Sequence, residues 1–345
     1  MATILGIEST CDETGAAVVV DGFDVRSDVV ASQVELHAKY RGVVPEIASR
    51  AHIENILPVL REALASANIP LNDIDAVAVA HRPGLIGSLL VGVTAAKSLA
   101  WALGKPLIGV DHVHAHLYSV VLERNESPPM PALGLVCSGG HTALYRVNDW
   151  LDVKLIGSTI DDAIGEAYDK VAAVLGLGYP GGPILDRLAQ QGDPQAVRFP
   201  RTLLGRDSLD FSFSGLKTAV LYHVRGVPRP GQHVKSESSR KLQEREMADI
   251  AASFQAACVD VVVEKLRRAA RQIDAKSVVI GGGVSANQGL RAALSGFTLP
   301  VFLPPLRYCT DNAAMSAGLA HVYFRERRFS DLGLEAIAYS QFSDV

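Results

Sequence analysis

The chain has few of the features that mark secreted, membrane-spanning or strongly basic proteins. Its 345 residues include four cysteines, at positions 11, 137, 258 and 309, and no two of them form a Cys-x-x-Cys pair. Such spacing is typical of free thiols in a reducing compartment and excludes a disulfide framework. The net charge is only −4. The sequence therefore has no general attraction for nucleic acid, and any RNA contact must come from local patches.

A targeting segment and a long uncharged run are also missing. No basic segment precedes the first apolar stretch, residues 3–7, so we expect no secretory leader. The longest helix-like apolar stretch, residues 88–103, contains Lys97 and is short for a bilayer. We therefore expect a cytoplasmic protein that does not contact membrane.

Two common motifs are absent as well. Val113 stands where a His-Glu-x-x-His zinc peptidase has its catalytic glutamate. The glycines at 281–283 match neither the Gly-x-Gly-x-x-Gly dinucleotide fingerprint nor a Walker loop. With 48% hydrophobic, 6% aromatic and 20% charged residues, the chain reads as a globular protein, long enough for two domains.

What the sequence does contain is a pair of histidines, His112 and His116, just after an expected strand at 106–110. Positions i and i+4 lie on one face of a helix, so both imidazoles can reach one metal ion. Asp111 is a good N-cap candidate, and the first-turn dipole favours neutral rings. The alternative is a helix face whose histidines are solvated or part of the core.

A carboxylate offers a third ligand. Asp311 precedes an expected helix at 313–323, and it could either cap that helix or face the histidines. Two histidines and one carboxylate would leave coordination positions open on the metal. A substrate oxygen could then bind there, which permits Lewis-acid chemistry.

The order of strands and helices predicts an α/β protein with a mixed sheet in each half. Residues 4–9 and 16–20 should form one hairpin, and residues 132–137 and 143–147 a second, which suggests two related halves. We expect helices at 88–103, 161–175 and 247–272, with Asp162 and Asp169 on one face of the second. Residues 225–240 are the best candidate for a mobile loop.

Two glycine-containing turns suit an anionic ligand. The turn at 138–140 and the run at 281–287, which ends in Asn287, can bring backbone N–H groups close to a phosphate or a carbonyl oxygen. The alternatives are an ordinary hairpin turn and tight packing of a strand against a helix.

Five long motifs carry a family resemblance. They are GIESTCDET at 6–14, GVVPEIASRAH at 42–52, SGGHT at 138–142, FSFSGLKT at 211–218 and GGGVSAN at 281–287. In this order, from residue 3 to about residue 320, the chain resembles the tRNA adenosine threonylcarbamoyltransferase (TsaD-like) family of the actin-like ATPase (ASKHA) superfamily.

The resemblance implies two related lobes, each a mixed sheet flanked by helices, with a ligand cleft between them. Residues 1–125 with about 322–345 would form one lobe, and residues 126–321 the other. The implied reaction moves the threonylcarbamoyl group of threonylcarbamoyl-AMP to the exocyclic amine of the adenosine 3′ of the anticodon, in tRNAs that read codons starting with A. The implied partners are tRNA, a paralogue without the metal site, and a small ATPase.

The resemblance also implies roles for residues. His112, His116 and Asp311 would hold iron or zinc. The substrate would be lined by Val136, Cys137, Ser138, Gly139 and Gly140, and its polar parts would be held by Asp169, Gly182, Asp186 and Asn287. Backbone N–H groups at 138–140 and 281–283 would stabilise developing charge. Glu13 or Asp12 is the candidate base. Arg82 departs from the family, which often has glycine there.

Three other functions stay open at this point. One is an ATP-dependent small-molecule kinase of the same superfamily, although such a kinase does not need a His–His–Asp set. The second is a metallopeptidase, which the missing glutamate at 113 disfavours in its zincin form. The third is a nucleotide-gated scaffold without catalysis.

Overall fold

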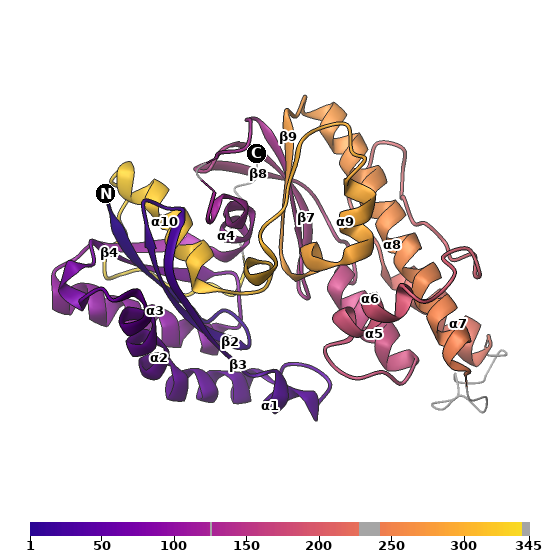
Figure 1. Cartoon of the computed structure of the whole chain (residues 1–345), viewed down its shortest axis with the longest axis horizontal. Coiled ribbons are helices and arrows are strands. Elements are labelled where there is room, and N and C mark those ends of the chain that lie inside the picture. The colour runs from indigo at the N-terminus through magenta and orange to yellow at the C-terminus, as the bar shows by residue number, and fades with distance from the viewer. Residues whose placement is uncertain (125, 228–241, 340–345) are drawn as a thin grey trace.

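The computed structural model describes residues 1–124, 126–227 and 242–339, and two five-stranded sheets dominate it (Figure 1). The first sheet has the order β3-β2-β1-β4-β5. Its strands are β1 (Thr3–Glu8), β2 (Glu13–Val20), β3 (Asp24–Ser32), β4 (Ala76–Arg82) and β5 (Leu107–Asp111). The second has the order β10-β9-β6-β7-β8. Its strands are β6 (Ala132–Cys137), β7 (Thr142–Asp149), β8 (Asp152–Ser158), β9 (Ser277–Gly281) and β10 (Val301–Phe302).

The two sheets repeat one pattern of pairing. β1 pairs antiparallel with β2 and parallel with β4, and β6 pairs in the same way with β7 and β9. Both predicted hairpins are therefore present, and the prediction of two related lobes is confirmed. Each sheet contains three parallel strands. They are β1, β4 and β5 in the first sheet and β6, β9 and β10 in the second.

Helices cover the faces of both sheets (Figure 1). They are α1 (Val34–Ala38), α2 (Pro45–Ala67), α3 (Ile86–Leu103), α4 (His112–Tyr118), α5 (Ile164–Val174), α6 (Gly181–Ala189), α7 (Ser214–Arg225), α8 (Glu244–Gln272), α9 (Gln288–Leu294) and α10 (Ala313–Arg325). Short 3-10 turns are η1 (Leu71–Asp73), η2 (Ser119–Val121), η3 (Gly283–Ala286) and η4 (Leu306–Tyr308). From residue 228 on, the loop predicted at 225–240 lies outside the described residues.

Side chains along the strands of the first sheet point alternately to its two faces, and each face packs against different helices. Val77 and Val79 of β4 pack with the core beneath α2 and α3. The opposite face presents small residues to α10, such as Ala78. A Cβ on Gly6 would lie 2.8 Å from the Cβ of Ala317. The small residues of β1 and β4 thus let α10 approach the sheet closely.

Helix α3 is long and apolar enough to cross a membrane by composition alone. It nevertheless packs Val93, Ala96 and Ala100 into the core that α2 and β4 share. It is therefore part of the first lobe, as the sequence predicted for residues 88–103.

A central core joins the lobes. Leu117 of α4 packs in one cluster with Val136 of β6, Val279 of β9 and Leu319 of α10. This packing places the start of α4 where the carboxyl ends of the parallel strands of both sheets meet. In α/β folds this is the end of a sheet at which ligands bind.

The predicted helix at 161–175 begins only at Ile164, so Asp162 and Asp169 do not share a helix face and that prediction was wrong. Asp161 instead accepts hydrogen bonds from the hydroxyls of Ser212 and Ser214 at 2.6 and 2.7 Å, at the start of α7. Asp162 pairs with Lys217 of α7 at 3.0 Å. Contacts with α7 thus hold this acidic pair outside the helix.

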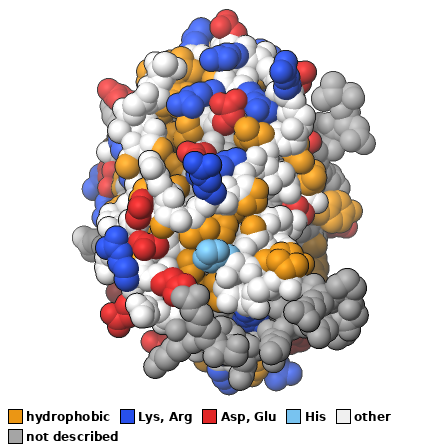
Figure 2. Space-filling model, turned by 90° about the vertical axis from the view of Figure 1, so that its right-hand side faces the viewer, with side chains coloured by type: hydrophobic (Ala, Val, Ile, Leu, Met, Phe, Trp, Pro, Cys, Tyr) orange, Lys and Arg blue, Asp and Glu red, His pale blue; other side chains and the backbone are white. Residues whose placement is uncertain are grey.

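One face of the second lobe shows its charge distribution (Figure 2). Basic side chains gather in the upper part of this face, with acidic and apolar side chains between them. Charge on this face is therefore local rather than continuous, as the small net charge predicts.

Candidate metal and substrate site

The start of α4 is built by a side-chain cap. Asp111 Oδ1 accepts hydrogen bonds from the backbone N–H groups of Val113 at 2.9 Å and His114 at 3.2 Å. The predicted N-cap is confirmed, and it fixes the first turn on which His112 lies. His116 lies one turn further, and the two imidazole rings are 4.6 Å apart between centroids.

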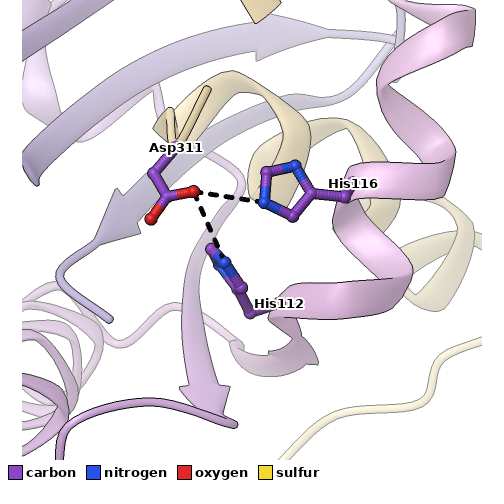
Figure 3. A group of neighbouring side chains, drawn as sticks. All are labelled: His112, His116 and Asp311. Carbon is purple, nitrogen blue, oxygen red and sulfur yellow. Dashed lines mark hydrogen bonds and ion pairs between the residues drawn. The ribbon is translucent and has the colours of Figure 1, made fainter. Parts of the chain in front are cut away.

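Asp311 faces these rings from another element (Figure 3). Asn312, not Asp311, caps α10, because its Oδ1 accepts from the N–H of Met315 at 2.9 Å. Asp311 is thereby left to point at α4. Its Oδ1 lies 3.1 Å from His116 Nε2 and 3.6 Å from His112 Nε2. The structure thus brings together all three residues that the sequence nominated as metal ligands, with ligand atoms within 4.8 Å of one another.

The electrostatics of the three side chains are coupled. Burial would raise the pKa of Asp311, but His112 and His116 hold it well below its usual range. Burial would lower the pKa of His112, but Glu8 and Asp311 outweigh that effect and raise it to about 9. Burial lowers the pKa of His116. The site therefore carries positive charge on His112 next to an ionised carboxylate, and a metal cation would replace that charge.

The donor set fits a divalent cation. Two imidazole nitrogens and a carboxylate oxygen are ligands that zinc and iron accept. His112 Nδ1 lies 3.3 Å from Glu8 Oε2, which leaves Nε2 to face Asp311. His116 Nδ1 is buried and has no hydrogen-bond partner among the described residues. The three side chains are thus arranged around one point, which lies between the two Nε2 atoms and the carboxylate of Asp311.

Two residues near the metal ligands were not nominated from the sequence. Glu8 is fully buried and contacts His112. Burial and the nearby charges of His112 and His116 lower the pKa of His141 to about 4, so it is neutral at physiological pH. Both residues lie inside motifs of the resemblance, which was the only signal that could have found them.

The turn between β1 and β2 carries Asp12 and leads directly into Glu13, the first residue of β2, and His52 of α2 holds this turn in place. His52 Nε2 donates to the carbonyl oxygen of Cys11 at 3.0 Å, and His52 Nδ1 lies 2.7 Å from Thr14 Oγ1. Burial, with the charges of Asp311 and Asp12, raises the pKa of Glu13 to about 9. Glu13 is therefore protonated at neutral pH when no cation offsets Asp311.

The turn after β6 is open above its glycines. A Cβ on Gly139, Gly140 or Gly182 would meet nothing within 4 Å. Val136 and Cys137 are buried at the end of β6, and the Ser138 hydroxyl accepts from the N–H of His141 at 3.1 Å. The backbone at 139–140 and at 182 is thus accessible for close approach by a ligand.

The remaining nominated residues form two groups on α5, α6 and α9. Asp169 accepts from the N–H groups of Gly181 at 2.7 Å and Gly182 at 3.3 Å, which joins α5 to the start of α6. Asp186 Oδ2 accepts from the N–H of Gln288 at 3.0 Å, one residue after Asn287. Its other oxygen, Oδ1, is buried without a hydrogen-bond partner in the described chain.

Asn287 stabilises the start of α9. Its Oδ1 accepts from the N–H of Leu290 at 2.8 Å, and its Nδ2 donates to Gln255 Oε1 at 2.8 Å. Asn287 therefore caps α9 and joins it to α8.

The run of three glycines divides into two kinds. A side chain on Gly281 would collide with the carbonyl of His116, and Gly282 has φ +89° and abuts the carbonyl of Cys137. Gly283 is nearly open, with only Thr310 Cγ2 at 3.9 Å. Close packing of β9 against α4 and β6 thus accounts for the first two glycines.

Comparison with known proteins gives a consistent result. A family model described as tRNA N6-adenosine threonylcarbamoyltransferase matches residues 24–318. A protein of that name from Moorella thermoacetica is 52% identical over 97% of this chain and 95% of its own length. Another of that name, from Trichlorobacter lovleyi, is 51% identical over the same shares.

Solved structures of low identity share the fold. Component A of (R)-2-hydroxyglutaryl-CoA dehydratase from Acidaminococcus fermentans covers 95% of this chain and 100% of its own, with TM-score 0.54 and 14% identity. Full-length HypF covers 98% of this chain and 47% of its own, with TM-score 0.58 and 16% identity. These likenesses show the actin-like ATPase (ASKHA) fold alone. The sequence comparisons reach further: the chain belongs to the tRNA N6-adenosine threonylcarbamoyltransferase family.

Proposed function

We propose that the chain transfers the threonylcarbamoyl group of threonylcarbamoyl-AMP to the exocyclic amine of the adenosine 3′ of the anticodon, in tRNAs that read codons starting with A. The observation that carries this proposal is the meeting of His112, His116 and Asp311, whose charges act on His141 next to the turn at 138–140. Membership of the family makes the chain a tRNA-modifying transferase.

We assign His112, His116 and Asp311 to one divalent cation, iron or zinc. When bound, such an ion supplies Lewis acidity to a substrate oxygen. The protein's own part is to hold two imidazole rings and an ionised carboxylate around one point, where the cation would replace the proton on His112. The buried Asp111 cap and the Asn312 cap fix the two elements from which these side chains project.

We assign the substrate to the open glycines and to the polar groups beside them. Val136, Cys137, Ser138, Gly139 and Gly140 would line threonylcarbamoyl-AMP, while Asp169, Gly182, Asp186 and Asn287 would hold its polar parts. The unpartnered Asp186 Oδ1 supports this assignment, because a buried carboxylate oxygen without a donor is costly and a ligand hydroxyl would satisfy it. Backbone N–H groups at 139–140 would stabilise charge on the carbamoyl oxygen or the departing phosphate.

We assign to Asp12 or Glu13 the removal of a proton from the attacking amine. Asp12 lies on the turn that His52 holds, and Glu13 follows it as the first residue of β2. The charges of Asp311 and Asp12 both raise the pKa of Glu13. Glu13 can accept a proton only after its raised pKa falls, and a cation beside Asp311 would lower it. Glu13 would therefore be a neutral hydrogen-bond donor without the cation and a candidate base with it.

We propose that the chain works in the cytoplasm with a paralogue that lacks the metal site and with a small ATPase. Helices α2 and α3 present exposed apolar side chains one turn apart, Ile53 and Leu57 on the first and Ile86 and Leu90 on the second. These four residues form the α2–α3 strip. Because α2 and α3 pack side by side, the strip suits two helices of a related chain.

The test uses the purified chain, its paralogue and its small ATPase with threonylcarbamoyl-AMP and unmodified tRNA, followed by nucleoside analysis. We expect modified adenosine, and we expect His112→Ala to lower metal content and transfer together. Loss of one such electrostatic contact typically costs about 10²–10³ in rate. Full transfer by a variant shown to be free of metal would contradict the role of the cation.

A further inference from the structure

Glu8 is the last residue of β1 and is fully buried, yet the reaction described above does not use it. Its Oε2 lies 3.3 Å from His112 Nδ1 and accepts a hydrogen bond from the Ser316 hydroxyl at 3.1 Å. Its Oε1 accepts from the backbone N–H of Thr10 at 3.0 Å. Both oxygens of the carboxylate therefore have partners.

These contacts join three separate elements of the fold. His112 lies on α4, Ser316 on α10 just beyond Asp311, and Thr10 in the turn that leads to Asp12 and Glu13. The side chain of Thr10 also reaches His112 Nδ1, at 3.3 Å between Oγ1 and the nitrogen. A single carboxylate thus touches both elements that carry nominated metal ligands and the turn that carries the nominated base.

We propose that Glu8 is a positioning residue for the cation: it keeps the proton of His112 on Nδ1 and so presents the lone pair of Nε2 to the metal. An ionised carboxylate can only accept hydrogen bonds, so the N–H of the neutral ring must lie on the side of Glu8. Carboxylate–histidine pairs of this kind orient metal ligands and strengthen them as donors.

The bond to Ser316 extends this role to the third ligand. Ser316 lies one turn into α10, and Asp311 directly precedes Asn312, the N-cap of that helix. Glu8 therefore fixes the separation between α4 and the segment that carries Asp311, as well as the orientation of one ring. This inference rests on the cation assigned under the proposed function.

A purely structural role makes a different prediction. Removal of one partner of a buried ion pair usually costs stability, because the other charge is left buried without compensation. If Glu8 served packing alone, Glu8→Gln would change thermal unfolding of the metal-free protein and leave the metal affinity of the folded protein unchanged. The positioning role predicts instead that Glu8→Gln weakens metal binding by the folded protein.

The experiment titrates the metal-free full-length chain with Zn²⁺ against a chelator and with Co²⁺ by visible absorption. The variants are Glu8→Gln, which keeps the shape of the side chain, and Ser316→Ala, which removes one hydrogen bond from the same oxygen without touching His112. We expect Glu8→Gln to weaken Zn²⁺ binding about 10–100-fold and to alter the Co²⁺ spectrum. We expect Ser316→Ala to have a smaller effect in the same direction.

A Kd for Glu8→Gln within about twofold of the parent, with an unchanged Co²⁺ spectrum, would overturn the inference, as would a lower unfolding midpoint with unchanged affinity. Failure of the parent chain itself to bind either ion would instead defeat the metal assignment on which the inference rests. The two failures are therefore distinguishable. Thermal unfolding of each metal-free variant shows that the affinity is measured on folded protein.

Discussion

At the scale of single residues, burial and neighbouring charge decide which side chains near the site are ionised. Asp311 and Glu13 are both partly buried carboxyls, yet their pKa values move in opposite directions. Histidines next to Asp311 lower its pKa, whereas carboxylates next to Glu13 add to the effect of burial and raise its pKa to about 9. Identical chemistry thus gives one anion and one neutral acid within a single site.

Asp28 of β3 offers a test of this balance at a residue that is not itself a nominated metal ligand. Burial raises its pKa from 3.8 to about 6, although hydrogen bonds from the backbone of Ala314 and Ala313 oppose the rise. The folded state therefore binds this proton more tightly than the unfolded state. Stability from this group is full below pH 3.8 and is lost as the pH rises through about 6. A pKa difference of about 2 corresponds to at most about 3 kcal/mol.

We expect Asp28→Asn to flatten the dependence of stability on pH in that window. The measurement is the free energy of unfolding by urea at pH 4 and pH 7 for the parent chain and the variant, both free of metal. The parent should lose more stability than the variant between the two values, because only the parent has to ionise the partly buried carboxyl of Asp28. Equal losses would show that Asp28 titrates normally in the folded protein.

At the scale of elements, the start of α4 depends on two residues at the ends of neighbouring strands, Asp111 of β5 and Arg82 of β4. Asp111 caps the helix with Oδ1, and its other oxygen lies 3.3 Å from Arg82 Nε at the end of β4. The structure thus gives this residue a partner: it holds the cap from the neighbouring strand, and the cap holds the turn of His112.

Removal of the cap should therefore cost stability. We expect Asp111→Ala to lower the free energy of unfolding by about 0.5–2 kcal/mol, as for other N-caps. Arg82→Ala should lower it by less, because the guanidinium is partly exposed and the pair is screened. Urea unfolding of the metal-free variants measures both effects. The order of the two losses is the critical result, and a larger loss for Arg82→Ala would contradict the assigned roles.

Elements that depend on neighbouring residues were predictable from the sequence. The hairpins, the cap at Asp111 and the helix after 313 follow from local pattern and chemistry, and the structure confirms them. The start of α5 was not, because Asp161 is held by Ser212 and Ser214, which lie far along the chain. Local spacing could not reveal a competitor that only folding brings near.

The candidate site shows the same division. Spacing alone paired His112 with His116, and Asp311 was nominated as one of two options for its segment. Glu8 could not be nominated, because 104 residues separate it from His112 and no periodicity links them. Motifs of the resemblance contained Glu8 and His141 without stating what either contacts. The structural contacts supply that information.

At the scale of the whole molecule, the α2–α3 strip is an exposed apolar surface on the first lobe. Each residue of the α2–α3 strip is at least half exposed. We expect the double variant Ile53→Asp, Leu90→Asp to lose association with the paralogue, because two buried apolar contacts would become charged. Co-elution in size-exclusion chromatography measures the association.

Leu306→Asp is the matched control, since Leu306 is also exposed but lies on η4, away from the strip. This control should co-elute as the parent does, and both variants should unfold at the temperature of the parent. Unimpaired co-elution of the double variant would show that the paralogue binds elsewhere.

The close seat of α10 on the small residues of β1 has a mechanical consequence. Asp311 lies just before the N-cap of that helix, and His112 and His116 follow β5 of the same sheet. The open glycines at 139, 140 and 182 are carried by the second sheet and its helices. Any hinge rotation between the sheets would change the gap between cation and substrate while the coordination itself stays rigid. Reach, rather than ligation, is the quantity that such a movement would control.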